Sequence, residues 1–185
     1  MRTDRIEFRL KDGRLAVLRN PEEKDIEGML QYLKISSGET EFLMRYPEEC
    51  ERYTVESEKA LFDRCNASET EAMLVCIVDG KFAGNCCISW NNRIKTGHRA
   101  SVAIALLSEF WNQGIGTRMF QEMIQIAERN PRLMQLELEF IEGNARGRAL
   151  YEKMGFRITG VKPNAIRLKD GTMLNEYSMI RELKR

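Results

Sequence analysis

Two closely spaced glycines connect an apolar run to an amphipathic helix near the middle of the chain, and this junction constrains the fold most. The apolar run covers Ala100 to Leu107, and the junction consists of Glu109, Phe110, Trp111, Asn112, Gln113, Gly114, Ile115, Gly116 and Thr117. Because glycine has no Cβ atom, Gly114 and Gly116 let the backbone approach a ligand closely. The following helix adds the positive end of its dipole. The pattern predicts a strand, a turn and a helix with a phosphate site over Asn112 to Thr117, although an ordinary strand-to-helix turn can have the same sequence.

A second motif follows after a stretch long enough for a helix from Thr117 to Arg129 and a strand from Leu133 to Phe140. It reads Asn144-Ala145-Arg146-Gly147-Arg148-Ala149-Leu150-Tyr151-Glu152-Lys153-Met154-Gly155-Phe156. This segment resembles the pattern N-x-x-A-x-x-L-Y-x-x-x-G-F of the GNAT superfamily, the acyl-CoA-dependent N-acetyltransferases. In that family an earlier G-x-G turn holds the pyrophosphate of coenzyme A, so both motifs occur here in the family's order. Trp111 stands where Arg or Gln is common, and Gly147 replaces the usual Ala.

The resemblance implies a role for several residues. Tyr151 is implied to protonate the departing thiolate of the coenzyme as a general acid. The backbone N–H groups near Leu106 and Leu107 are implied to meet the pantetheine and the developing oxyanion. Asn144 is implied to contact the pantetheine or acetyl region, and helical geometry places Arg148 on the same side of the helix, so we include it in the coenzyme site.

Ordinary structural roles compete with two of these assignments. Tyr151 is predicted at the edge of the core, where a tyrosine can simply bury its ring and leave its hydroxyl in water. Asn144 precedes the predicted helix and is a good N-cap residue. The cap and the coenzyme contact would compete for the same amide.

Composition excludes several other classes of protein. A net charge of +1, with acidic and basic residues mixed throughout, gives no electrostatic footprint for nucleic acid. We find neither a membrane segment nor a secretory signal, so a cytoplasmic enzyme is expected. Five cysteines without C-x-x-C spacing and a single histidine offer no zinc site, and no metal is expected. Because His98 is the only histidine, direct transfer in a ternary complex is favoured over a covalent cysteine route.

The rest of the pattern predicts further hairpins, helices and strands. The hairpins are Ile6 to Leu10 with Leu15 to Arg19, and Met73 to Val78 with Phe82 to Trp90. One helix is expected to begin at the N-cap Asn20 with Pro21 as its first residue, and a second to run from Thr54 to about Arg64. The last strands are expected near Phe156 to Val161 and Met173 to Ile180.

These elements indicate a single GNAT-like domain over residues 1–185 with an α/β (α+β) fold. The expected architecture is a mixed, mostly antiparallel central sheet with helices on both faces. The run from Ala100 to Leu107 is apolar on both faces and predicts a covered central strand. The core-facing stripe of the following helix is expected at Met119, Phe120, Met123, Ile124 and Ala127.

The acceptor is less constrained than the coenzyme. Glu39 and Glu41 lie in a polar segment that matches the family's substrate-covering loop in position, and two acids there suit a cationic amine, although a solvated acidic turn explains them equally well. Trp90, in the turn before Arg93, is a second candidate rim of the acceptor site. The general base is not identified, and the conceivable acids are Glu41, Glu109, Glu137 and Glu139.

The sequence therefore favours an N-acetyltransferase that uses acetyl-CoA as cosubstrate and acts on a small-molecule amine or a peptide N-terminus. No nucleic acid or membrane partner is expected, and a homodimer is left open. The alternative is a non-catalytic acyl-CoA binding or sensing module, because a fold does not fix a function.

Overall fold

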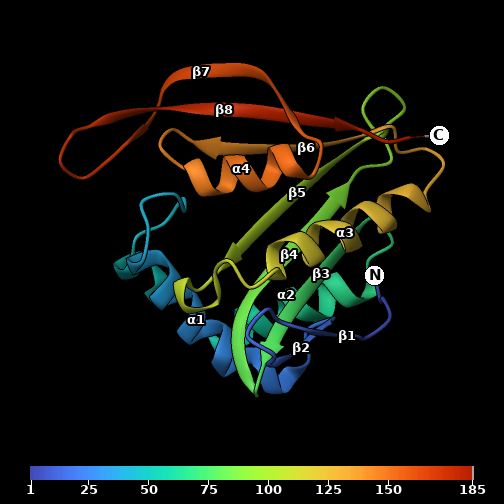
Figure 1. Cartoon of the computed structure of the whole chain (residues 1–185), viewed down its shortest axis with the longest axis vertical. Coiled ribbons are helices and arrows are strands. Elements are labelled where there is room, and N and C mark those ends of the chain that lie inside the picture. The colour runs from blue at the N-terminus through green and yellow to red at the C-terminus, as the bar shows by residue number, and fades with distance from the viewer. Residues whose placement is uncertain (185) are drawn as a thin grey trace. The chain divides into compact units, whose positions relative to one another are not determined.

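The chain divides into two compact units. The computed structural model describes residues 1–184. The first unit comprises Met1–Ser89 and Ala103–Met119, and the second comprises Trp90–Val102 and the chain from Phe120 on. Three elements contribute to both units, because the boundaries fall inside strand β4 (Lys81–Trp90), strand β5 (Arg99–Leu106) and helix α3 (Ile115–Glu128). Figure 1 labels the elements along the chain.

Four antiparallel strands form the sheet of the first unit. They are β1 (Ile6–Arg9), β2 (Leu15–Arg19), β3 (Glu71–Val78) and β4 (Lys81–Trp90). The pairings β1–β2, β2–β3 and β3–β4 are all antiparallel, and β5 lies next to β4. Asp79 and Gly80 join β3 to β4 with φ angles of 49° and 81°, which suits the tight turn of a two-residue hairpin. Both predicted hairpins are confirmed.

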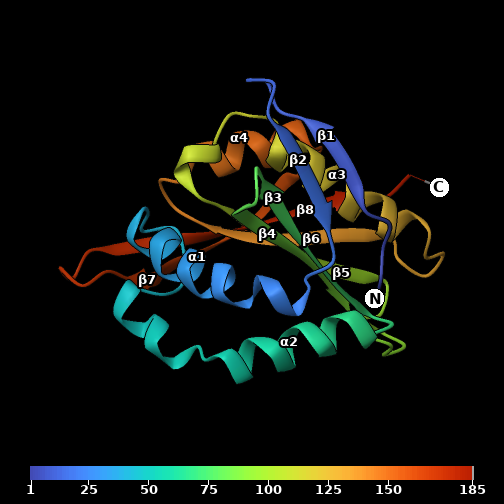
Figure 2. The same cartoon turned by 90° about the horizontal axis from the view of Figure 1, so that it is seen from below.

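Helices α1 (Ile26–Gly38) and α2 (Val55–Ala67) lie side by side on one face of these strands (Figure 2). Two short 3₁₀ helices precede them, η1 (Glu23–Asp25) and η2 (Pro47–Arg52). The side chain of Thr54 accepts a hydrogen bond from the Ser57 N–H, so the predicted start of α2 is confirmed. The Tyr32 ring lies 5.0 Å from the Phe82 ring and packs α1 onto β4.

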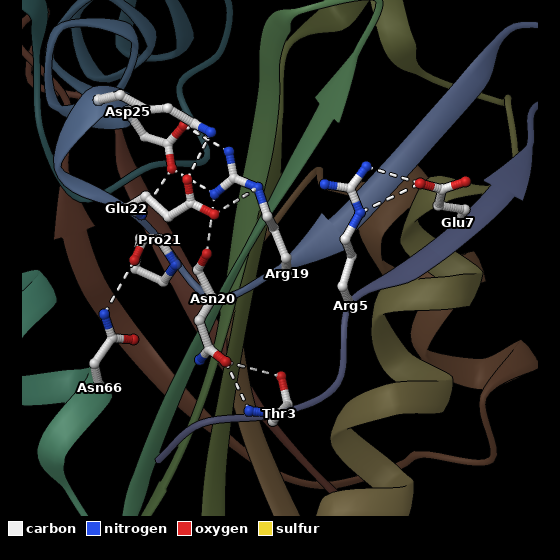
Figure 3. A network of polar contacts seen from close by, with 10 residues as sticks. Thr3, Arg5, Glu7, Arg19, Asn20, Pro21, Glu22, Asp25 and Asn66 are labelled. Atoms are coloured by element: carbon white, nitrogen blue, oxygen red, sulfur yellow. Dashed lines mark hydrogen bonds and ion pairs between the residues drawn. The ribbon is translucent and has the colours of Figure 1, made fainter.

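The predicted N-cap at Asn20 is wrong. The cap of the first helical turn is Glu22, and Asn20 instead binds the N-terminal segment and strand β3. Figure 3 shows its contact with Thr3. Its Oδ1 accepts from the Thr3 N–H at 2.7 Å, and its Nδ2 donates to the carbonyls of Met1 and Met73. An amide that can both donate and accept fits this connecting position better than a cap, which uses only its oxygen.

The second unit contains the beginning of β5, most of α3 and the elements that follow. These are β6 (Gln135–Ile141), α4 (Ala145–Lys153), β7 (Arg157–Arg167) and β8 (Met173–Glu182). Strand β6 pairs in parallel with β5 and antiparallel with β8, and β8 pairs antiparallel with β7. The Phe120 and Phe140 rings both contact Tyr151, so α3 and α4 pack together over β6. The predicted mixed, mostly antiparallel sheet with helices packed on it is confirmed.

Strand β5 differs from its prediction. Ala100 and Val102 are buried, but Ser101 and Ala103, which alternate with them, are exposed, so only one face of the strand is covered there. The apolar sequence of this strand did not reveal its exposed face, because alanine is small enough to be tolerated in contact with water. The predicted stripe of α3 is confirmed, since all five of its residues are buried.

Candidate functional site

The G-x-G turn forms the start of α3. Arg118 N–H is hydrogen-bonded to the Gly114 carbonyl at 3.1 Å, so the N–H groups of Ile115 and Gly116 precede the first bond within the helix. Gly114 has a φ of 95°, a left-handed conformation that favours glycine, and a Cβ added there would meet nothing within 4 Å. Asn112 is also left-handed, with a φ of 62°. The turn therefore presents backbone amides at a helix start with open space above Gly114, an arrangement that suits an anion.

The segment from Leu106 to Trp111, which leads into this turn, is held by its own hydrogen bonds. The Leu107 N–H donates to the Ala83 carbonyl of β4 at 2.9 Å, and the indole Nε1 of Trp111 donates to the Leu106 carbonyl at 3.0 Å. Of the two N–H groups assigned to the pantetheine, that of Leu107 is thus engaged with β4. The indole bond gives a physical reason for a tryptophan where the family commonly has Arg or Gln.

Strand β4 comes unusually close to the end of β5. A Cβ on Gly84 would lie 2.3 Å from the Ala105 carbonyl oxygen and 2.8 Å from the Leu106 Cα, both backbone atoms that cannot move aside easily. Only glycine fits this approach. The same approach brings Ala83 within hydrogen-bond distance of Leu107.

The acidic loop after α1 reaches the same segment. Glu39 Oε2 accepts from the Ser108 N–H at 2.8 Å, and Glu39 Oε1 accepts from the Ser108 hydroxyl at 2.6 Å. Glu41, two residues further on, is exposed. The structure therefore brings Glu39 to the residues before the G-x-G turn and leaves Glu41 at the surface.

Tyr151 lies in the second unit within an aromatic cluster. Its ring is 5.7 Å from Phe120 and 5.9 Å from Phe140, and the residue is only 8% exposed. Burial raises the pKa of its phenol, so the hydroxyl stays protonated at neutral pH. The side chain thus has the protonation state that a proton donor needs, and the ring also serves the core.

Asn144 and Arg148 belong to the same helix as Tyr151. Asn144 Oδ1 accepts from the Gly147 N–H at 2.9 Å, so its predicted role as the N-cap of α4 is confirmed. Arg148 is exposed and forms an ion pair with Glu152, with 2.8 Å between Nε and Oε1. Trp90, at the end of β4, is half-buried before a turn in which Asn91 Oδ1 accepts from the Arg93 N–H and the Thr96 hydroxyl.

A cavity of about 430 Å³ lies elsewhere in the first unit. Its lining includes Arg19, Glu22, Glu23, Lys59 and Asn66, and several of these charges pair with one another, as in the ion pair of Lys59 with Glu23 at 2.9 Å. It contains no residue that the sequence assigned to a site. We therefore assign it no function.

The cysteines are poorly suited to nucleophilic catalysis. Burial raises the pKa of the Cys76 and Cys87 thiols to about 12, and that of Cys65 is also raised by burial. Among residues 1–184 no group of three or more His, Cys, Asp or Glu side chains is arranged to hold a metal ion. No helix in this part of the chain is long and apolar enough to cross a membrane.

Sequence reasoning missed Ser108 and Ala83. Ser108 follows the apolar run directly, but serine after a strand is common in turns and gives no signal of its own. Its partner Glu39 is 69 residues away in the sequence. Ala83 acts through its carbonyl, which no side-chain pattern can reveal.

Comparisons with known proteins agree on one family. Residues 16–157 match the family model of the Acetyltransferase (GNAT) domain. The chain is 30% identical over 108 residues to the L-amino acid N-acetyltransferase AaaT of Escherichia coli (strain K12). That match covers 58% of this chain and 66% of AaaT, slightly less than two thirds of its length.

Solved structures share the fold. A GNAT acetyltransferase from Streptococcus pneumoniae has a TM-score of 0.84 at 24% identity, covering 91% of this chain and 99% of that one. YncA from Salmonella typhimurium, a putative acetyltransferase solved with its cofactor acetyl-CoA, has a TM-score of 0.77 at 15% identity, covering 92% and 95% of the two chains.

Proposed function

Because the chain belongs to the GNAT family of acetyltransferases, we propose that it moves an acetyl group from acetyl-CoA to a primary amine by direct transfer in a ternary complex. The observation that carries this proposal is the open, left-handed turn at Gly114 where α3 begins. The Salmonella relative, which was solved with acetyl-CoA, supports the choice of cosubstrate.

The turn from Asn112 to Thr117 fits the pyrophosphate of the coenzyme. Backbone N–H groups at a helix start complement a phosphate, and the missing Cβ of Gly114 leaves room for its oxygens. Leu106 and Leu107 would line the pantetheine at the end of β5, while the Leu107 N–H stays bonded to the Ala83 carbonyl. In α4 the Oδ1 of Asn144 serves the cap, so its Nδ2 is the group that would donate to the coenzyme, and Arg148 would contribute positive charge.

The thioester of acetyl-CoA supplies the acetyl group. An uncharged amine attacks its carbonyl carbon, a C–N bond forms and the C–S bond breaks, and the nitrogen gives up its extra proton to solvent or to the base, which is not identified. Tyr151 would give its phenolic proton to the departing sulfur, and its raised pKa keeps that proton in place until transfer. A cysteine intermediate is disfavoured by the raised pKa values of the buried thiols.

The acceptor is proposed only as a class. AaaT is named for L-amino acids, which makes free amino acids the first acceptors to test. Glu41 and Trp90 are the acceptor contacts that we retain, because both remain at least partly accessible. A peptide N-terminus presents the same primary amine and belongs in the same panel.

A thiol-release assay tests the proposal. The purified chain is mixed with acetyl-CoA and a panel of amines that contains amino acids, a polyamine, a sugar amine and a peptide with a free N-terminus. We expect release of free coenzyme thiol that depends on an amine. Coenzyme binding by calorimetry without release for any amine would favour the non-catalytic binding module, and absence of binding would refute both functions.

A further inference from the structure

Both carboxylate oxygens of Glu39 are occupied by one residue. Oε2 accepts from the Ser108 N–H at 2.8 Å and Oε1 accepts from the Ser108 hydroxyl at 2.6 Å. Hydrogen bonds to an ionised acceptor are shorter and stronger than neutral ones, and two of them fix orientation as well as distance. The Glu39 carboxylate therefore fixes both the backbone N–H and the side-chain hydroxyl of Ser108.

The backbone of Glu39 is fixed by the end of helix α1. Glu39 is the C-cap of α1, and its own N–H donates to the carbonyls of Ile35 and Ser36 at 3.2 and 3.3 Å. Helix α1 is in turn packed on β4 through Tyr32 and Phe82. The carboxylate is thus presented by the end of a helix and not by the middle of a free loop.

Ser108 lies between the end of β5 and the G-x-G turn. On one side of it the Leu107 N–H is bonded to Ala83, and on the other side the Trp111 indole is bonded to the Leu106 carbonyl. Glu39 adds a third attachment, and it is the one that comes from α1. Backbone amides can bind a phosphate strongly only if they are already oriented, because orienting them on binding costs affinity.

We infer that Glu39 is a positioning residue for the coenzyme, and not a residue that attracts the cationic acceptor. It holds Ser108 and thereby orients the strand end at Leu107 and the start of the Asn112 to Thr117 turn. This inference rests on the proposed function, because it assigns Glu39 to the coenzyme side of the same site.

Calorimetric titration with coenzyme A tests the inference without requiring turnover. Four proteins form a double-mutant cycle: wild type, Glu39→Ala, Ser108→Ala and the double variant. We expect Glu39→Ala to weaken coenzyme affinity by roughly three- to tenfold, and the double variant to be no weaker than Glu39→Ala alone. Glu39→Gln should weaken coenzyme affinity less, because the amide of the new side chain can still accept from the Ser108 N–H and donate to the Ser108 hydroxyl.

A matched control and a kinetic measurement separate positioning from general stability. Glu51→Ala removes an exposed carboxylate from η2 in the same unit and should leave coenzyme affinity unchanged. In the acetyl-transfer assay the Glu39 variants should raise the KM for acetyl-CoA and leave the KM for the amine alone. If Glu39→Ala fails to fold, Glu39→Gln and Ser108→Ala carry the same test.

Several outcomes would overturn the inference. Additive effects of Glu39→Ala and Ser108→Ala would show that the two residues act independently. A rise in the KM for the amine alone would return Glu39 to the acceptor site. An equal loss of coenzyme affinity in Glu51→Ala would show that the effect is not specific to Glu39. If the wild-type chain does not bind coenzyme A at all, the proposed function fails and this inference fails with it, whereas binding without coupling rejects the inference alone.

Discussion

Two carboxylates in the first unit each accept hydrogen bonds through both oxygens, yet they differ in burial. Asp25 accepts from Arg19 Nη1 at 2.6 Å and Nη2 at 2.9 Å, with side chains only 7% and 9% exposed. Glu39 accepts from Ser108 in a similar two-point arrangement at the protein surface. A buried charge that loses its partner cannot turn to water, whereas a surface charge can. We therefore expect Asp25 to contribute mainly to the stability of the fold and Glu39 mainly to the affinity for the ligand.

The surroundings of Asp25 support its structural role (Figure 3). The Glu22 N–H donates to Asp25 Oδ2 at 2.8 Å, and Arg19 Nη1 also donates to the Asn20 carbonyl at 3.0 Å. The pair therefore fastens the end of β2 to the start of α1. In the same view, Arg5 and Glu7 form a pair that is mostly in water, with side chains 60% and 51% exposed.

The largest expected effect is on stability. Asp25→Ala leaves the buried Arg19 guanidinium with only the longer contact to Glu22, 3.6 Å from its Nε, and should lower the free energy of unfolding by about 3 kcal/mol. Denaturant unfolding measures this change. Glu7→Ala breaks the exposed pair with Arg5 and should change stability by less than about 1 kcal/mol. Equal losses in the two variants would mean that burial does not decide the contribution of these ion pairs.

The second effect is on catalysis in the second unit. Tyr151→Phe keeps the ring and its packing on Phe120 and Phe140, so stability should be retained while kcat falls roughly 100-fold. Tyr177→Phe is the matched control, because Tyr177 stacks on Phe140 at 5.3 Å in the same cluster. Steady-state kinetics with the best acceptor measure kcat for both variants. Wild-type turnover by Tyr151→Phe would leave Tyr151 with a core role only.

The third effect is on coenzyme affinity. Gly116→Val places a branched side chain at the start of α3 and should weaken coenzyme binding at least tenfold, or about 1.4 kcal/mol. Gly116 is the better choice than Gly114, whose φ of 95° would strain any other residue regardless of the ligand. In strand β7, Gly160→Val is a suitable control, since a Cβ there meets nothing within 4 Å. Unchanged affinity in a folded Gly116→Val protein would reject the phosphate placement.

The sequence predicted local features more accurately than distant contacts. The hairpins, the start of α2 at Thr54, the Asn144 cap and the apolar stripe of α3 were all predicted, because each depends on residues a few positions apart. Asn20 was misread because its partners, Met1, Thr3 and Met73, lie on other segments. The contact between Glu39 and Ser108 was missed for the same reason. The site residues drawn from the family resemblance stay predictions, which the experiments above address.

Removing the charge of a buried acid whose pKa is raised should change stability in the opposite direction to Asp25→Ala. Glu58 on α2 is 3% exposed, and burial raises the pKa of its carboxyl, partly opposed by Arg45. A raised folded-state pKa favours the protonated form, so the folded protein loses stability as pH rises from the unfolded value of about 4.3 through the folded one. Glu58→Gln should therefore stabilise the protein at pH 7 by roughly 1 kcal/mol, and by less near pH 4.

Thermal unfolding at several pH values measures this difference. Glu56→Gln is the control on the same helix, because hydrogen bonds from its own backbone N–H and from Thr54 lower the pKa of Glu56. Glu56→Gln should not increase the stability of the protein at neutral pH. A Glu58→Gln gain that is the same at pH 4 and pH 7 would mean that the charge of Glu58 is not the cause.

The smallest expected effect is at Glu41, the acid in the loop after α1 that stays exposed. If it attracts a cationic acceptor, Glu41→Gln should raise the KM for the amine roughly two- to fivefold and leave the KM for acetyl-CoA unchanged. The effect should shrink in high salt, because an exposed charge pair is screened. This is the reverse of the pattern expected for Glu39, the C-cap of α1, although Glu41 follows it by only two residues. An amine KM that does not change at any ionic strength would make Glu41 a solvated acid and direct the search for the acceptor contact to Trp90 and the turn that follows it.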